Sequence, residues 1–495
     1  MTKESNMKNI ARFLKVSVLI LLSTSLLQSC FLFNKNKGGG ISSTTGAAYG
    51  SASDTLSFSP YDIQNLPNPP GMVFVQGGRT ILGSFEQDLF GARDNIERTV
   101  TVNSFYMDET EITNKDWKEY VYYQFHPMVE QMGKDTEIKD DPNNPFIPAT
   151  TSHNGQEMAD LVPNDSVWAS DFSFNDVYSQ NYYSNPGFND YPVVGVTWRQ
   201  VVDYTKWRTD FVNYTKIIAS VDFEELPDEF KLEFYNPDGS LQMLGNSAST
   251  TGTQEIFLDE LDQLQQDMIT YINANKKMFI ERGLYLPEFR LPNEAEWAYA
   301  AKATVGTQYL DENEEYGRIY PWDGRGVRNP YGKRRSELLA NFKRGRGDYA
   351  GIAGNINNDG NVIPAAVGNY EPNDFGLFNM GGNVSEWVND TYRPLSYSDV
   401  EDLNPVRKDG TSDPESNYGW GDGRNEFRSL INDRAKVYKG GSWKDVAYWM
   451  SPGTRRYLDQ DKATNTIGFR CAMISIGFES FQSGGGGFLG LGGGE

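Results

Sequence analysis

The segment from residue 437 to residue 473 constrains the fold of this chain more than any other stretch. It opens on two adjacent glycines, Gly440 and Gly441, directly before a Ser-Trp pair. Such a pair predicts a backbone bend with positive φ, or a close approach that a Cβ atom would block. The segment is otherwise rich in polar residues and aromatics. Its planar cations are Arg455, Arg456 and Arg470. This pattern suits either a structural scaffold assembled from hydrogen-bonded loops or a catalytic centre.

The letters KGGSW, SPGTRR and TIGFRCA in this segment resemble the C-terminal signature of the formylglycine-generating-enzyme, or sulfatase-modifying factor, family. Other blocks that carry the resemblance are FYMDETEITNKDW at 105–117, PVVGVTW at 192–198, FRLPNEAEWAYAA at 289–301 and NMGGNVSEW at 379–387. The resemblance implies an α+β fold with a C-type-lectin-like core. Short twisted strands, a few helices and much irregular structure are expected.

The residues that follow the double glycine bear on catalysis. In family members that oxidise a sulfatase cysteine, two cysteines follow this turn and bind copper. Counted from Gly440, the equivalent positions here hold Asp445 and Met450. Copper(I) requires soft thiolate ligands, which a carboxylate and a thioether replace poorly. The resemblance therefore implies a pseudoenzyme with no catalytic residues and no copper. An active sulfatase-maturing oxidase is the opposing hypothesis, and it would need thiols at both positions.

Two oxygen-rich segments are candidate cation sites. Side-chain oxygens and main-chain carbonyls can surround a hard cation, and calcium prefers such oxygen shells. The resemblance implies Asn379, Gly382, Val384 and Glu386 as ligands of one structural calcium site, and Asn341, Phe342, Asp359 and Asn361 as ligands of a second. Calcium would stiffen loops at these sites rather than react. Side-chain hydrogen bonds alone are the alternative.

The first 29 residues have the pattern of an export signal. Four basic residues precede an apolar run that is too short to span a bilayer as a permanent helix. The letters LLQS then lead to Cys30, which resembles a bacterial lipoprotein processing box; an ordinary secretory signal is the alternative. Several acyl chains on Cys30 together would hold the protein on a membrane. The sequence therefore predicts a lipid-anchored exported protein.

Composition divides the remaining chain into three parts. Residues 30–66 are rich in Gly, Ser, Thr, Asn and Lys and predict a flexible tether. Residues 67–480 predict one family domain, and the Gly-rich residues 481–495 predict a disordered tail. The domain is expected to carry two insertions. Residues 122–189 predict an irregular surface excursion, and residues 211–283 contain an amphipathic helix that either packs on its own domain or binds another protein.

Hydrophobic periodicity predicts the first elements of the domain. Strands are expected at 72–75 and 80–83, paired as a hairpin, and residues 99–102 and 104–107 together predict one further strand. Residues 192–198 predict another strand that leads directly into a helix. Helices are expected to begin near Thr113 and after Trp198. Glu294 and Glu296 resemble an acid/base pair, but their position at the start of a third helix favours interaction with its dipole.

Residue counts exclude several chemistries. The only cysteines are Cys30 and Cys471, so no intramolecular disulfide is expected if Cys30 carries lipid. Two histidines, His126 and His153, are too few for a three-histidine metal site, and no phosphate-binding loop of the G-x-x-x-x-G-K-[ST] type is present. The formal net charge is −22; the signal carries four cations and one anion, so the rest of the chain is near −25. Such a field repels nucleic acid, which we exclude as a partner.

Several stretches resemble one branch of the family, the gliding-motility lipoproteins of Bacteroidota. These are the processing box, STTG at 43–46, SFYMDETEITN at 104–114, PNDSVWASDFSFND at 163–176, PGFNDYPVVGVTW at 186–198 and YKGGSWKDVAYWMSPGTRR at 438–456. The resemblance implies a scaffold on the periplasmic face of the outer membrane, with other lipoproteins and periplasmic components of gliding and type IX secretion as partners. A lipoprotein that binds carbohydrate or peptide is the alternative.

Overall fold

The computed structural model describes residues 69–84, 95–135, 152–153, 156–157, 161–170, 173–220, 269–281, 283–305, 318–322, 326–330, 332, 334–351, 361–393, 401–407 and 434–476. The chain divides into two compact units, Met1–Asn65 and Leu66–Glu495, and every described residue lies in the second. The predicted signal, Cys30, the tether and the tail therefore lie outside the described residues.

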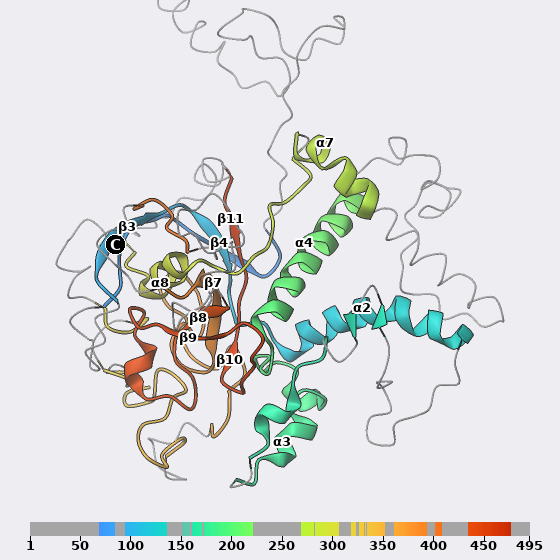
Figure 1. The fold of residues 1–495 in the computed structure, drawn as a ribbon. Coiled ribbons are helices and arrows are strands. Elements are labelled where there is room, and N and C mark those ends of the chain that lie inside the picture. The colour runs from blue at the N-terminus through green and yellow to red at the C-terminus, as the bar shows by residue number, and fades with distance from the viewer. Residues whose placement is uncertain are drawn as a thin grey trace, which may run out of the picture. The chain divides into compact units, whose positions relative to one another are not determined.

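Two small sheets form the centre of this unit (Figure 1). The first consists of β1 (Met72–Val75), β4 (Phe105–Asp108) and β11 (Ala472–Ile474), with β4 in the middle and antiparallel to both neighbours. The second has the order β10–β7–β8–β9, with β10 at Ile467–Gly468, β7 at Ser385–Thr391, β8 at Ala435–Lys439 and β9 at Arg456–Asp459. Only the β10–β7 pair is parallel. The start and the end of the predicted domain thus meet in the first sheet.

Strands form at the first two predicted positions, but the predicted hairpin is wrong. The single strand expected over 99–107 is two strands in different sheets, and the strand expected at 192–198 is reduced to an isolated bridge between Pro192 and Thr113. β2 (Gly78–Leu82) pairs with β3 (Arg98–Val102) in a separate two-stranded sheet, whereas β1 pairs with β4. Gly77 lies between β1 and β2, and a Cβ atom there would stand 2.5 Å from the carbonyl oxygen of Val102, at the end of β3. The link between β1 and β2 therefore passes the link between β3 and β4 at a distance that only glycine permits.

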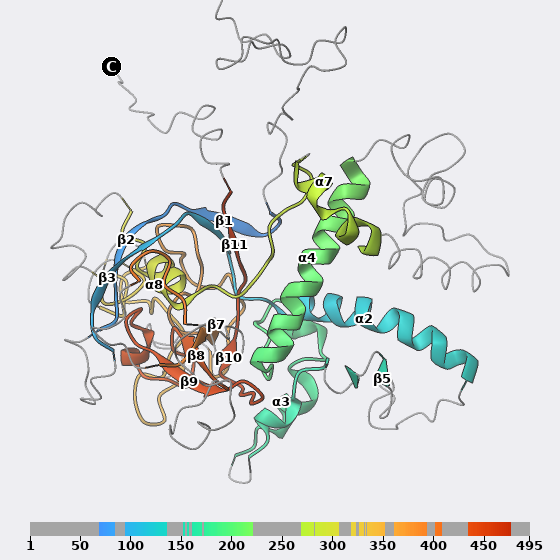
Figure 2. The ribbon, with the colours of Figure 1, turned by 45° about the horizontal axis from the view of Figure 1, so that its top comes forward.

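The helices lie on two sides of these strands (Figure 2). α8 (Glu294–Lys302) contacts β2, β3 and β7, whereas α2 (Asn114–Asp135) and α4 (Trp198–Ser220) contact each other. The predicted helix starts are confirmed: the Thr113 hydroxyl accepts from the amide of Asp116, as an N-cap does. The shorter elements are β5 (Ser152–His153), β6 (Gln156–Glu157), η2 (Asp165–Trp168), α3 (Asp176–Asn181), η3 (Pro186–Phe188), α7 (Lys276–Glu281) and η5 (Ala447–Met450). Among the described helices, none has the length and apolarity needed to cross a membrane.

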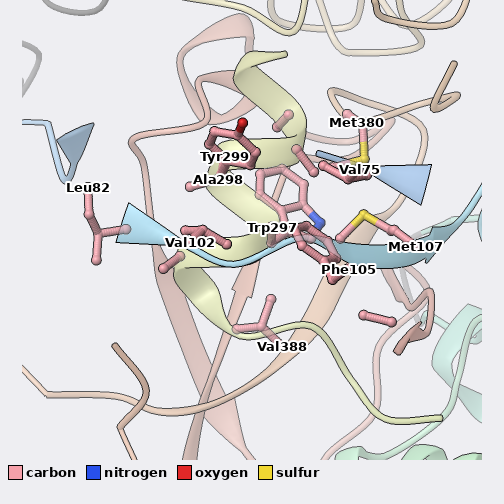
Figure 3. Packing of buried hydrophobic residues seen from close by; sticks show 14 of the residues in the cluster. Val75, Leu82, Val102, Phe105, Met107, Trp297, Ala298, Tyr299, Met380 and Val388 are labelled. Carbon is pink, nitrogen blue, oxygen red and sulfur yellow. The ribbon is translucent and has the colours of Figure 1, made fainter. Parts of the chain in front are cut away.

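One cluster of the hydrophobic core surrounds Trp297 of α8. Its ring lies beside Phe105 and Met107 of β4 (Figure 3), and all three side chains are buried. A second core cluster lies between α2, α4 and the strands, where Trp117 and Tyr204 stack at 5.4 Å and both meet the edge of Phe469. Aromatic residues spread along the whole domain therefore converge on two adjoining clusters.

Residues 122–189 are expected to form an irregular surface excursion, and the described part of the stretch departs from this at two places. Helix α2 continues through Asp135. Further along, Trp168 and Tyr182 are buried, and Trp168 stacks on Trp443 with ring centroids 5.9 Å apart. Most other described side chains of the stretch are half-buried or exposed. The two buried aromatics come from different short elements, Trp168 from η2 and Tyr182 from the C-cap of α3, so they produce no periodicity in the sequence.

The described part of the 211–283 insertion packs on its own domain. Residues 269–281 are helical with a break at Asn275, and Ile272 and Phe279 are buried against Tyr214 and Ile217 of α4. Of the two readings of the amphipathic helix, the structure supports intramolecular packing for these residues. The predicted helical residues before 269 lie outside the described part.

Candidate functional site

The double glycine makes the turn that the sequence predicts. Gly440 and Gly441 have φ values of +94° and +69°, which side chains rarely adopt. A Cβ on Gly440 would stand 3.0 Å from the Trp297 ring, and one on Gly441 would stand 2.9 Å from the carbonyl carbon of Trp449. Both glycines are therefore required for conformation and for space, and Gly440 brings the chain after β8 against Trp297 of α8.

Asp445, five residues after the first glycine, is held by an arginine. Both of its carboxylate oxygens accept from Arg456 at 2.7 Å, in a two-bond arrangement. The Ser442 hydroxyl donates to the same carboxylate at 2.6 Å. The guanidinium of Arg456 also stacks over Tyr438 and Trp449 at 4.9 and 4.6 Å. A carboxylate held in this way is neutralised and oriented, and it offers no free base or nucleophile.

Met450 lies in the interior. Its side chain is fully buried in a small cluster with Leu338, Ala340 and Phe342. The thioether thus serves packing, and it ties η5 to the 338–342 loop. The Asp445 carboxylate therefore forms an ion pair, whereas the Met450 thioether packs in a core cluster.

A second and deeper ion pair lies between β7 and the end of the chain's signature segment. Glu386 accepts from the Nε and Nη2 atoms of Arg470 at 2.7 Å each, and from the indole Nε1 of Trp297 at 2.7 Å. Arg470 also donates to the main-chain carbonyls of Phe378, at 2.7 Å, and Asp108, at 3.1 Å. The donors of Arg470 thus bind several segments at once. They join β4 and the loop before β7 to the segment that contains β10 and β11.

Glu111 extends this deep cluster, and sequence reasoning missed it. Its carboxylate accepts from Asn379 at 2.7 Å and from Asn383 at 3.1 Å, and both asparagines adopt positive φ. Burial, and then the nearby charge of Glu386, raise the pKa of Glu111 to about 8, while Arg470 and the two amides act in the opposite direction. The only signal for this role is that Glu111 carries a carboxylate in the segment after β4, where the residues that follow it are buried.

Among the predicted calcium ligands that the structure describes, the polar side chains already have protein partners. Both oxygens of Glu386 face N–H donors, and Asn379 donates to Glu111 and to the carbonyl of Val367. Asn341 donates to Ile363 and Asn383, and Asn361 donates to the Tyr370 hydroxyl. Asp359 lies outside the described residues. No cluster of three His, Cys, Asp or Glu suited to a metal occurs among the residues described.

This geometry limits how calcium would fit. An ion at the first site would have to draw mainly on main-chain oxygens, such as those of Gly382 and Val384, because the Glu386 carboxylate is paired with a cation. Calcium stays a prediction at both sites. It is tested by measuring whether a chelator lowers the unfolding temperature and whether added calcium restores it.

Two other groups of titratable residues have structural roles. Glu296 accepts from the main-chain amide of Asn293 and from Arg290, as a helix-start carboxylate does. Glu294 is buried between Lys439 and Arg455, at 3.3 and 3.0 Å, and these cations lower its pKa against the opposing effect of burial. The position of both carboxylates at the start of α8 is thus confirmed. Cys471 is buried, and burial raises the pKa of its thiol well above the ordinary value.

Comparison with known proteins places the whole framework in one family. Residues 59–474 match the family described as sulfatase-modifying factor enzyme 1-like domain. Because this match spans most of the chain, the protein belongs to the sulfatase-modifying factor family. The α+β fold expected from the sequence is confirmed.

Individual relatives agree with this assignment over a part of the chain. A formylglycine-generating enzyme of Streptomyces coelicolor is 30% identical over 186 residues, which is 37% of this chain and 46% of the enzyme. An inactive Cα-formylglycine-generating enzyme 2 of Mus musculus is 28% identical over 189 residues, 37% of this chain and 42% of that protein. The chain thus spans less than half the length of these relatives. A solved structure of PvdO from Pseudomonas aeruginosa covers 82% of this chain and 94% of its own, with 15% identity and a TM-score of 0.38.

Proposed function

We propose that this chain is a non-catalytic, lipid-anchored scaffold of the outer membrane that acts in gliding motility and type IX protein secretion. The observation that supports a non-catalytic role is the state of two positions after the double glycine: Asp445 is neutralised by Arg456, and Met450 is buried. By the resemblance, these are the positions of the two reactive cysteines. The chain has no other cysteine within this segment than the buried Cys471. The family also contains relatives described as inactive.

The particular branch is proposed from the sequence. The stretches quoted above resemble the gliding-motility lipoprotein GldJ more than its relative GldK, chiefly in the residues around Trp168. In the structure that tryptophan completes the core beneath the turn at Trp443. At this tryptophan, the stretch that resembles the gliding-motility branch packs into the core. This packing supports a structural role for the stretch.

A direct activity measurement tests the non-catalytic role. The purified full-length chain is incubated with copper and a sulfatase-derived peptide that contains the target cysteine, and conversion of the thiol to an aldehyde is followed by mass spectrometry. The Streptomyces coelicolor enzyme serves as the positive control. We expect no conversion, because no thiolate pair is available to bind copper(I). Aldehyde formation would establish the oxidase hypothesis instead.

The anchor and the partners need separate measurements. Metabolic labelling with a fatty acid should mark the wild-type chain and not the Cys30→Ala variant, and fractionation should place only the former in the outer membrane. Crosslinking mass spectrometry in intact envelopes should recover gliding and secretion lipoproteins. Recovery of bound carbohydrate or peptide alone would favour the ligand-binding alternative.

A further inference from the structure

The surface beside Asp445 carries a local excess of positive charge in a strongly acidic chain. The main-chain amide of Lys343 donates to the Asp445 carbonyl at 2.9 Å, which fixes the 343–348 loop to the turn that carries Lys444. An antiparallel bridge between Gly345 and Asp348 closes the loop and leaves Arg346 exposed at its tip. We call Lys343, Arg346 and Lys444 the basic rim.

The carboxylates of this loop and turn are already neutralised. Asp445 is paired with Arg456, and Asp348 accepts from Arg344 at 2.7 Å. These two pairs leave the three cations of the basic rim in excess. The formal net charge of the chain is −22, so this concentration of positive charge runs against its general composition.

In the described part of the chain, neutral groups hold the two lysines of the rim, and neither lysine forms a salt bridge there. Lys343 Nζ lies 4.9 Å from the centre of the Tyr349 ring, and Lys444 Nζ lies 4.9 Å from the centre of the Trp443 ring. Lys444 also donates to the Asn465 side-chain oxygen at 3.1 Å. Rings and amides hold an ammonium in place without supplying a negative charge. Burial, and to a smaller degree the repulsion from Lys343, lower the pKa of Lys444, while Asp445 opposes them.

We propose that the basic rim binds a short acidic peptide segment of a partner protein. Three cations, two of which are held by aromatic rings, match a cluster of two or three carboxylates, and complementary charge of this kind gives specificity and a fast encounter. The ligand must be short, because a long polyanion would be repelled by the acidic remainder of the chain. This proposal rests on the proposed scaffold role, since it describes a surface that holds a partner.

The test is a binding titration with the full-length chain in detergent. A fluorescein-labelled hexaglutamate peptide is the probe, with its anisotropy recorded at low and physiological salt. We expect saturable binding that weakens with salt, and a loss of roughly tenfold or more in affinity for the Lys343→Glu/Lys444→Glu variant. Lys343→Arg/Lys444→Arg should retain binding. Lys343→Gln/Lys444→Gln gives the same test without charge reversal if the first variant fails to fold.

A matched control separates a site from general electrostatics. Lys206→Glu/Lys277→Glu changes the net charge by the same amount, at exposed lysines on α4 and α7. An equal loss in this control would overturn the proposal, and so would the absence of any hexaglutamate binding. Binding of an alginate oligosaccharide in place of the peptide would assign the rim to acidic polysaccharides and reject a peptide partner. In each of these cases the oxidase assay and the envelope crosslinking still decide the scaffold role independently.

Discussion

Two arginine–carboxylate pairs in this protein have nearly the same hydrogen bonds and opposite surroundings. The Glu386–Arg470 pair and the Asp445–Arg456 pair both form two bonds of 2.7 Å. The side chains of the first pair are 1% and 0% exposed, and those of the second are 17% and 21% exposed. Hydrogen-bond geometry alone would give the two pairs equal contributions to stability. Burial decides what each does, because a charge left alone in the interior has no water to compensate it.

The inner pair joins segments that are far apart in the chain, whereas the outer pair lies within the C-terminal segment and makes one hydrogen bond beyond it. Arg470 reaches β4 and the loop before β7, while Arg456 and Asp445 are 11 residues apart and Arg456 also donates to the Ser385 hydroxyl of β7 at 3.0 Å. We therefore regard the inner cluster as the joint of the framework and the outer pair as a local closure of the turn after the double glycine. Substitutions in the inner cluster should accordingly cost more stability than substitutions in the outer pair.

Replacing Arg470 should have the largest effect. Arg470→Met leaves Glu386 and Glu111 buried without a cation, and breaking a buried pair in this way costs about 3–5 kcal/mol. The main-chain carbonyls that Arg470 now satisfies add to the loss. Urea unfolding of the purified chain measures the change, and Arg470→Lys should recover only a part of it. A stability close to wild type would show that the joint does not depend on this charge.

The pH dependence of stability should report Glu111. Its pKa is about 8 in the folded protein and near 4.5 when unfolded, so the native state holds a proton that the unfolded chain releases between these values. Stability from this group is therefore fully present below pH 4.5 and falls as the pH rises towards 8. The total is on the order of 4 kcal/mol.

The Glu111→Gln variant isolates that contribution. The amide cannot ionise, so the variant should lose stability less steeply than wild type between pH 5 and 8 in urea unfolding series. The difference between the two slopes is the measurement, because the other carboxylates titrate in both proteins. Parallel slopes would mean that Asn379, Asn383 and Arg470 keep Glu111 ionised at neutral pH.

The sequence allowed much of the framework to be predicted. The glycine pair, the strand positions and the helix starts at Thr113 and Trp198 follow from local chemistry that needs no knowledge of distant residues. Gly440 is a clear case, because positive φ and the absence of a side chain are both local requirements. The family resemblance then supplied the α+β class, which the family match confirms.

Contacts between distant segments could not be predicted in the same way. Nothing local indicates that Glu111 meets Asn379 and Asn383, which lie 268 and 272 residues away. The buried role of Trp168 was missed because a single aromatic in a 3-10 turn produces no periodicity. The strand pairing of β1 was mispredicted for a related reason: β1 pairs with β4, and the next strand along the chain, β2, pairs with β3 instead.

Met450 should show an intermediate effect. Truncation to alanine in Met450→Ala leaves a cavity among Leu338, Ala340 and Phe342, and such a change in a closed core costs roughly 2–5 kcal/mol. Met450→Leu keeps the volume and should cost less than about 1.5 kcal/mol. Thermal or urea unfolding measures both variants. A negligible loss for Met450→Ala would indicate that the position faces solvent in solution, as an open reactive site would require.

The smallest effect should come from the outer pair. Arg456→Met is the same chemical change as Arg470→Met, and it removes a partly exposed ion pair. Such a pair contributes about 1 kcal/mol to stability, because water solvates the charges when the pair is absent. The loss should shrink in high salt, because a pair that solvent reaches is screened, whereas the loss at Arg470 should barely change. Asp445→Asn in the Arg456→Met background should add little, since the two side chains act on each other. If the two arginine variants instead lost equal stability with equal salt dependence, then the outer pair would also join the framework, and the turn after the double glycine would be part of the core that it closes.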